Sequence, residues 1–308
     1  MIFKKTVSFL FLLIAVNYQF LAQSNLLNAK TVDKIGFQTE NFKKQTIDKP
    51  LPYSYVADRD ILWSKIVWET IDLNEKINHP LYFPTDSLSG SKRLSLFNTL
   101  NKSLQSKKNF EIYKSSYLIN PKAKSSVDSV LSNKCNYNKI ITTITVKPEE
   151  ITQFQIKGIW YFDKRQSELK YRLLAIAPMV SKGAKSKCAE LNLKQKNRKL
   201  NKGKSGNQKI KFEPILTDPI PLYWAYYPEL RSILHESKVF NPETTIQSIS
   251  FDQILNARRF SSVIIKEQNV YGDRAIEDYI HGNSLFRLLE AEKIKEDIRN
   301  REMDMWNY

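Results

Sequence analysis

The sequence predicts an α+β domain in which helices surround a small, mostly antiparallel sheet. Three observations support this class: a β-hairpin over about 158–178, a β-branched run at 140–146, and a long helix near the C-terminus, over 283–304. The chain has 308 residues, of which 42% are hydrophobic, so it can bury a substantial core.

The first 22 residues have the composition of a secretory signal peptide. Lys4 and Lys5 precede an apolar run from Val7 to Val16, and the exit Phe20-Leu21-Ala22-Gln23 favours cleavage after Ala22. The run is too short to span a bilayer of about 30 Å, and there is no cysteine near the exit. We therefore expect export to the periplasm, without a lipid or membrane anchor on the mature chain.

Residues 23–55 are polar and are interrupted by Pro50 and Pro52, which predicts an extended arm. Such an arm is either disordered or laid across a neighbouring subunit. The remaining residues, 56–308, are expected to form a single domain.

The stretch from Asp58 to Pro84 has apolar residues at spacings that favour one amphipathic helix. Trp68 falls among the charged residues of that predicted helix. Two interpretations are open for this side chain: it is covered by its own chain, or it contacts a partner protein, since Trp is enriched at desolvated interfaces.

The elements after this stretch alternate between helix and strand. Thr85–Ser91 is expected to be a loop, and the hairpin is bent at 164–167, with the far end of its second arm central in the sheet. Val263 to Lys266 fits either a helix or a strand. The other predicted elements are helices over 92–106, from 148, over 228–236 and over 250–260, and strands over 110–113, 140–146 and 222–226.

The apolar stripe of the last helix changes side along its length. Leu285, Leu288 and Leu289 share one face, whereas Ile294 and Ile298 lie nearly opposite. One arrangement docks the first half on the core and lets the second half and the tail reach a partner. The alternative is a bend near Glu290, with both halves packed within the domain.

The positive charge is concentrated in one segment. Residues 181–211 hold 11 Lys or Arg and one acid, out of a formal net charge of +16 for the chain. The segment lacks periodicity, which predicts a long surface insertion, and it has no Phe, Tyr or Trp, which argues against nucleic-acid binding. A solvated loop or an electrostatic contact with a membrane or an acidic partner remains open.

Motifs for catalysis or cofactor binding are missing from the sequence. Gly203-Lys-Ser205 lacks the earlier glycine of a phosphate-binding loop, because that position is Arg198. The three histidines are scattered, so no metal site is predicted. We expect no cofactor, and the sequence gives no reason to propose an enzymatic activity. Cys135 and Cys188 could pair in an oxidising compartment, but two free thiols are the expected state because Cys188 lies in the basic segment.

Several sequence words resemble those of the GldN/PorN family, and they occur in that family's order from Tyr55 to Tyr308. Only the basic segment departs from the family, being longer and richer in lysine than expected. The words are W-S-K-I-V-W, I-D-L-N-E-K-I-N, P-L-Y-F-P, G-I-W-Y-F-D-K-R, L-L-A-I-A-P, P-L-Y-W-A-Y-Y-P-E-L-R, F-S-S-V-I-I-K-E-Q-N and I-E-D-Y-I.

The resemblance implies a non-enzymatic part of the type IX secretion and gliding machinery. Such proteins form a periplasmic ring with an outer-membrane lipoprotein of the GldK/PorK type, and the ring also meets the inner-membrane motor complex. Association with the outer membrane would then be indirect, and the chain would be present in many copies.

Exposed aromatic and apolar side chains are the expected means of contact with these partners. The candidate partner-binding residues are Trp68, Tyr82, Trp224, Tyr226, Tyr227, Ile294, Ile298 and Trp306. The alternative function is a periplasmic binding module for anionic ligands that uses the basic segment 181–211. Deleting that segment would abolish the function of such a module, whereas a ring subunit should tolerate the deletion.

Overall fold

The computed structural model describes eight parts of the chain. They are residues 49–85, 93–106, 110–122, 131–137, 140–181, 188, 218–239 and 249–305. The predicted signal peptide, the arm up to residue 48, the predicted loop Thr85–Ser91 beyond its first residue, nearly all of the basic segment and Trp306 lie outside these residues. The compact unit to which the description below applies is Pro50–Tyr308.

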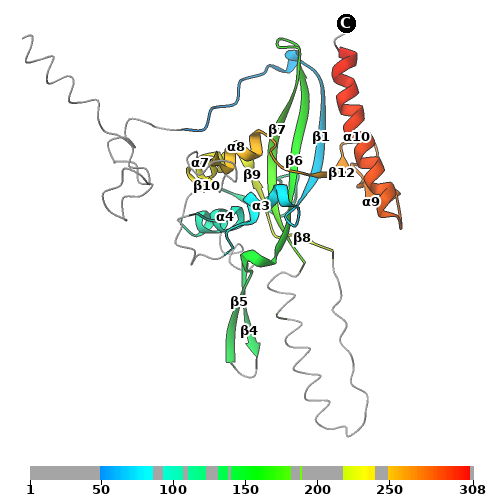
Figure 1. The fold of residues 1–308 in the computed structure, drawn as a ribbon. Coiled ribbons are helices and arrows are strands. Elements are labelled where there is room, and N and C mark those ends of the chain that lie inside the picture. Colours follow the sequence, from blue (N-terminus) through cyan, green and yellow to red (C-terminus); the bar gives the residue numbers. More distant parts are fainter. Residues whose placement is uncertain are drawn as a thin grey trace, which may run out of the picture. The chain divides into compact units, whose positions relative to one another are not determined.

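One sheet of antiparallel strands forms the centre of the domain (Figure 1). Its strand order is β12-β1-β6-β7-β9-β2-β3, with β8 paired beside β7. Its strands are β1 (Ile61–Asp72), β2 (Ile112–Tyr113), β3 (Pro121–Lys122), β6 (Ile151–Asp163), β7 (Glu168–Val180), β8 (Ile220–Pro221), β9 (Trp224–Tyr226) and β12 (Val263–Glu267). Two separate pairs are β4 (Ser132–Tyr137) with β5 (Ile140–Thr145) and β10 (Lys238–Val239) with β11 (Ile249–Ser250).

Helices pack around this sheet, which confirms the predicted α+β class. The α-helices of the described residues are α3 (His79–Tyr82), α4 (Leu96–Gln105), α7 (Tyr227–Glu236), α8 (Phe251–Asn256), α9 (Ile276–Tyr279) and α10 (Ser284–Met305). Short 3-10 turns occur at Asp58–Asp60, Lys76–Asn78 and Pro148–Glu150.

The prediction of one amphipathic helix from Asp58 to Pro84 is wrong, because most of that stretch is strand β1. β1 lies between β6 and β12, and Val67, Trp68 and Glu69 are buried in succession. The pairing register with β12 also shifts between Trp68 and Glu69. A strand that is buried on both faces and is irregular loses the polar alternation that identifies a strand, so its apolar spacing resembled that of a helix.

The predicted hairpin is confirmed, and it is longer than expected. β6 and β7 pair from Ile151 opposite Val180 to Asp163 opposite Glu168, and β7 also pairs with β8 and β9, so its far end is central. The register shifts beside Gly158. A methyl group at Gly158 would overlap the Tyr171 ring, so this position requires glycine.

The largest part of the core lies between the sheet and α4, α7 and α8. Each of these helices follows a sequence prediction, and the capping box of Ser250 and Gln253 opens α8 as expected. α8 ends at Asn256, four residues before the predicted end, and Val263–Glu267 proves to be a strand. Buried contributors include Leu96, Leu100, Phe154, Ile156, Leu173, Ile176, Leu230, Leu234, Phe251 and Leu255.

The last residues of the predicted arm are bound to the domain itself. The Tyr53 hydroxyl donates to Asn256 Oδ1 at 2.8 Å, and the guanidinium of Arg231 lies 4.2 Å from the centre of the Tyr53 ring. Arg172 donates to the carbonyl of Ser54, and Arg165 donates to that of Tyr55 at 2.9 Å. Residues 53–55 therefore pack on α7, α8 and the β6–β7 hairpin of their own chain rather than on a neighbouring subunit.

The two cysteines form a disulfide, so the free thiols expected from the sequence are not what the structure contains. Cys135 is on β4 and is buried, and its Cα lies 5.7 Å from that of Cys188. The bond joins β4 to the one described residue between 182 and 217. Within the described ranges, none of the helices has the length and apolar content needed to cross a membrane.

Candidate functional site: an apolar surface on α9 and α10

Three of the aromatic residues proposed as partner contacts are buried in the domain. Trp68, Trp224 and Tyr227 expose 2, 3 and 0% of their surface, so they support the fold and are not available to a partner. Trp68 and Trp224 belong to one small cluster that also contains Ala175 and Ala177 of β7. The intramolecular interpretation of Trp68 is therefore the correct one.

The remaining predicted contacts are only partly accessible or are buried. Tyr82 and Tyr226 are half-buried, and Tyr82 packs against the main core. Ile294 and Ile298 expose 3 and 4%, because the second half of α10 packs on β12 and β1. Neither arrangement considered for this helix is found: its second half is docked on the core, and the apolar side chains of its first half are exposed.

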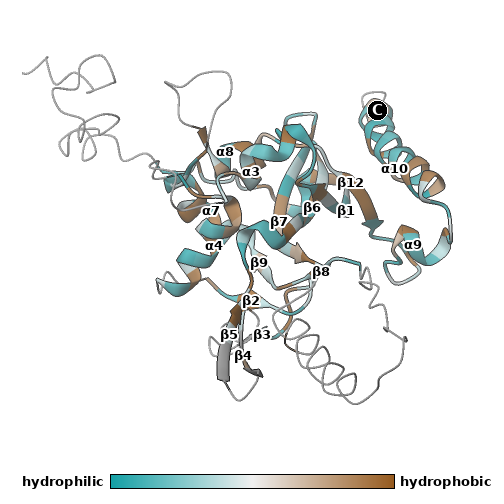
Figure 2. Cartoon of the chain, turned by 60° about the horizontal axis from the view of Figure 1, so that its bottom comes forward, coloured by the Kyte–Doolittle hydropathy of each residue, from teal (hydrophilic) through white to brown (hydrophobic). Residues whose placement is uncertain are grey.

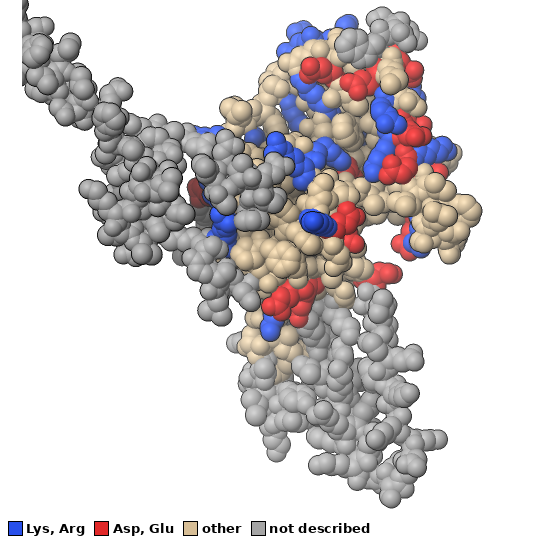
Figure 3. All heavy atoms as spheres, viewed as in Figure 1, with Lys and Arg blue, Asp and Glu red and all other residues tan. Residues whose placement is uncertain are grey.

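The first half of α10 and the adjoining α9 present large apolar side chains to solvent. Figure 2 shows apolar residues on the N-terminal turns of α10, and Figure 3 shows few charged atoms where α9 and these turns meet. We call this set the α9–α10 surface, and its members expose between 44 and 60%: Tyr279, Leu285, Phe286, Leu288 and Leu289. A group of large, exposed apolar side chains that lie next to one another typically marks a protein contact.

Two hollows adjoin the α9–α10 surface. One, of about 650 Å³, lies between β12 and the start of α10 and includes Leu285 and Leu288. The other, of about 510 Å³, includes Tyr279, Phe286 and Leu289. A partner could therefore insert side chains into this surface rather than only lie on it.

The α9–α10 surface is held in place by the buried half of the same helix. Ala291, Ile294 and Ile298 pack with Val67 of β1 and Ile264 of β12. Arg287 also donates to Glu277 of α9 at 2.9 Å. Because α10 is anchored to β1 and β12 by its buried half, the backbone that carries the exposed residues loses little conformational entropy on binding, which favours affinity.

Polar groups of the domain are used mainly to connect its elements. Arg258 donates twice to Glu69 of β1, at 3.1 and 2.7 Å, and Ser262 donates to the same carboxylate. Tyr227 and Arg231 of α7 donate to Asp252 of α8 at 2.9 and 3.0 Å. None of these bonds involves a residue of the α9–α10 surface.

Two lysines flank Trp68, on the face of the sheet opposite to the one that carries Glu69. Lys157 and Lys266 lie 5.0 and 4.5 Å from the Trp68 ring, and Tyr117 stacks edge-on against that ring and donates to Asp273 at 3.0 Å. Burial lowers the pKa of Lys157, Asp273 opposes this change, and Lys266 adds to it. Cation–π contacts explain how two lysines can be accommodated here.

The described residues contain no group of three or more His, Cys, Asp or Glu side chains that could hold a metal ion.

Sequence reasoning missed the residues of the α9–α10 surface as partner contacts. The signal for them in the sequence is the change of stripe at Leu285, Leu288 and Leu289, although the stripe alone does not show which half of the helix is buried.

The fold and this surface define the class of the protein: an α+β domain with an exposed apolar surface on α9 and α10. Residues 56–307 match the family described as "Gliding motility associated protein GldN". This match covers most of the sequence, and the chain belongs to the GldN family. Its family is thus associated with gliding motility, consistent with a component of the type IX secretion system. A search of curated proteins found no match to the chain.

Proposed function

We propose that the chain is a non-enzymatic structural component of the type IX secretion and gliding machinery. In this proposal it acts in the periplasm after removal of residues 1–22 and is held at the outer membrane by a lipoprotein of the GldK/PorK type. Family membership supports the assignment to this machinery, and the N-terminal sequence supports export to the periplasm.

The observation that carries this proposal is the α9–α10 surface. A structural component held at the outer membrane by a lipoprotein needs a contact surface for it, and this surface is apolar, hollowed and fixed in place. We assign it to the contact with the lipoprotein. The inner-membrane motor complex and further copies of the chain would bind elsewhere, and membrane contact would be indirect.

Co-isolation with the lipoprotein tests this assignment. The double variant Leu285→Ser/Leu289→Ser removes two exposed apolar side chains, so it should fold normally and lose at least about tenfold in affinity for the lipoprotein. The matched control is Glu292→Ser/Lys295→Ser, which breaks an exposed ion pair on the second half of the same helix.

The control variant should bind as well as the wild type. Equal recovery of the lipoprotein by the wild type and the Leu285→Ser/Leu289→Ser variant would contradict the assignment. Unfolding of that variant, checked by circular dichroism, is not expected because neither leucine belongs to the core.

A further inference from the structure

Strand β1 is paired along its whole length on one edge and only partly on the other. It pairs with β6 from Ile61 to Asp72 but with β12 only from Val67 to Thr70. Among the described residues, no strand lies beside Ile61–Lys65 on the β12 side, and we call these five residues the free edge. Unpaired edges are sites where another strand can add.

The direction of the backbone groups on the free edge follows from one hydrogen bond. The N–H of Gln268 donates to the carbonyl of Ile66 at 2.8 Å, so the backbone groups of Ile66 point away from β6. Alternate residues of an antiparallel strand point their N–H and C=O to the same side. The N–H and C=O of Ser64 therefore point outward as well, ready to pair with an added strand.

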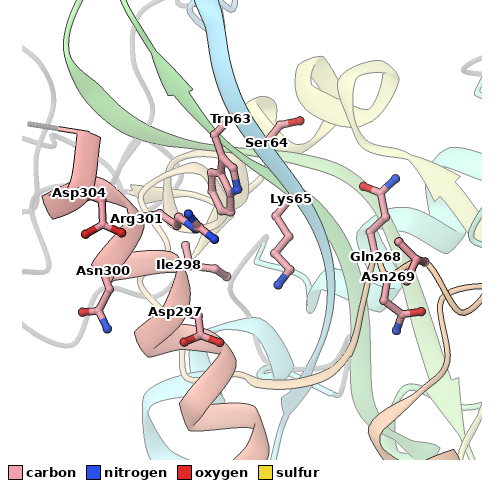
Figure 4. Close-up of a pocket in the computed structure, with 11 residues that line it drawn as sticks. Trp63, Ser64, Lys65, Gln268, Asn269, Asp297, Ile298, Asn300, Arg301 and Asp304 are labelled. Carbon is pink, nitrogen blue, oxygen red and sulfur yellow. The ribbon is translucent and has the colours of Figure 1, made fainter. Parts of the chain in front are cut away.

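A groove runs between the free edge and the second half of α10. It has a volume of about 780 Å³, and Trp63 and the exposed Val270 supply its accessible apolar side chains. Figure 4 shows Trp63 of β1 and Arg301 of α10 directed toward each other across it, while the Ser64 side chain points away. A groove between a strand edge and a helix fits an extended peptide, whose main chain pairs with the edge while alternate side chains enter the groove.

We propose that this groove binds residues 23–48 of a second copy of the chain as an added β-strand. This inference rests on the proposed function, which places many copies of the chain side by side. It adds a mechanism by which neighbouring copies are joined. These 26 residues precede the first described residue, Lys49, and could extend over about 85 Å. Pairing along the free edge uses only about five of them.

The sequence of this segment fits the groove. Ile35, Phe37 and Thr39 alternate with Gly36 and Gln38, a pattern that favours a strand with one apolar face. That face would meet Trp63 and Val270.

The place where the segment joins the domain favours pairing between copies. Tyr53 is bound to Asn256 and Arg231, on α8 and α7, and Arg172 and Arg165 hold the next two residues on the hairpin. The chain thus enters β1 from the side of β7 and α8, whereas the groove lies on the far edge of β1, beside β12. An arm that leaves the domain on one side and a groove on the other side fit a repeated head-to-tail contact between neighbouring copies.

Proline at position 64 provides a selective test. Ser64→Pro removes the outward N–H and obstructs an incoming strand, yet it spares the β6 pairing because this N–H does not point to β6. Ser64→Val keeps the N–H and is the matched control. Both are measured in the mature full-length chain by light scattering over a concentration series, together with a variant that lacks residues 23–48.

We expect concentration-dependent self-association for the wild type and Ser64→Val, weakened at least about tenfold in Ser64→Pro and in the truncated chain. A photoreactive residue in place of the exposed Asn300, used in a mixture of isotopically light and heavy chains, should crosslink to residues 23–48 of the other copy. A monomeric wild type, equal association of Ser64→Pro and Ser64→Val, or crosslinks only to the same copy or to another segment would overturn the proposal.

These outcomes are separate from those that bear on the proposed function. If Ser64→Pro associates normally while deletion of the gene stops secretion, the arm exchange is wrong and the secretion role stands. If gene deletion leaves secretion intact, the proposed function fails whatever the mass of the purified chain.

Discussion

Replacing Arg258 by methionine should lower the free energy of unfolding by about 3–5 kcal/mol, because it leaves the Glu69 carboxylate buried without its charge partner. Glu69 exposes 1% of its surface, and Arg258 binds it through two hydrogen bonds of 3.1 and 2.7 Å. The guanidinium also lies 4.1 Å from the centre of the Tyr171 ring. Methionine retains most of the apolar stem, so the loss reports mainly on the charge pair.

The same pair allows a double-mutant cycle. Glu69→Gln removes the charge but keeps an acceptor for Ser262, which also donates to this side chain. The variant Glu69→Gln/Arg258→Met should therefore be more stable than Arg258→Met alone, by at least about 1–2 kcal/mol. Such recovery would show that the cost of the single change is an uncompensated buried charge.

Urea unfolding followed by tryptophan fluorescence, with thermal unfolding in parallel, measures these differences. For a domain of this size, 3–5 kcal/mol corresponds to a fall in Tm of about 6–20 °C. A loss below about 1 kcal/mol for Arg258→Met, or strictly additive losses in the cycle, would refute the reasoning that this pair joins β1 to the loop after α8.

Three further changes test other contacts. Gly158→Ala should cost about 1–3 kcal/mol because the added methyl overlaps Tyr171, and Tyr171→Leu in the same chain should restore part of the loss in urea unfolding. Burial raises the pKa of Tyr53 from 10.0 to about 12, and the charge of Arg231 opposes this shift. The stability that Tyr53 provides is therefore complete below pH 10 and is lost between pH 10 and 12. The difference in free energy of unfolding between the wild type and Tyr53→Phe should shrink over that range, and a constant difference would contradict this. Cys135 and Cys188 close a loop across 53 residues, so Cys135→Ser/Cys188→Ser should lower the free energy of unfolding by up to about 4 kcal/mol, whereas two titratable thiols in the unreduced native protein would show that the bond does not form.

The hairpin and the helices under the sheet could be predicted from the sequence because their signals are local. β6 and β7 are joined by a polar turn, Pro228 lies in the first turn of α7, and Ser250 caps the start of α8. β1 could not be identified from spacing alone, since its burial depends on β6 and β12, which lie far away in sequence. Its β-branched residues, such as Ile66, Val67 and Ile71, were the available clue.

The candidate site shows the same division between local and distant information. The change of stripe along α10 was visible in the sequence, but which half docks depends on Val67 and Ile264, from two strands far from the helix. Trp224 and Tyr227 were attractive as partner contacts because aromatic clusters occur at interfaces. Burial in the domain explains them instead.

Deletion of the gene, followed by measurement of cargo in the medium and in the periplasm, tests the central claim most directly. We predict that cargo of the type IX route accumulates inside the cell and surface motility is lost, and that the wild-type chain restores both whereas Leu285→Ser/Leu289→Ser does not. Normal secretion and motility in the deletion strain would contradict the claim that this chain is a structural component of that machinery.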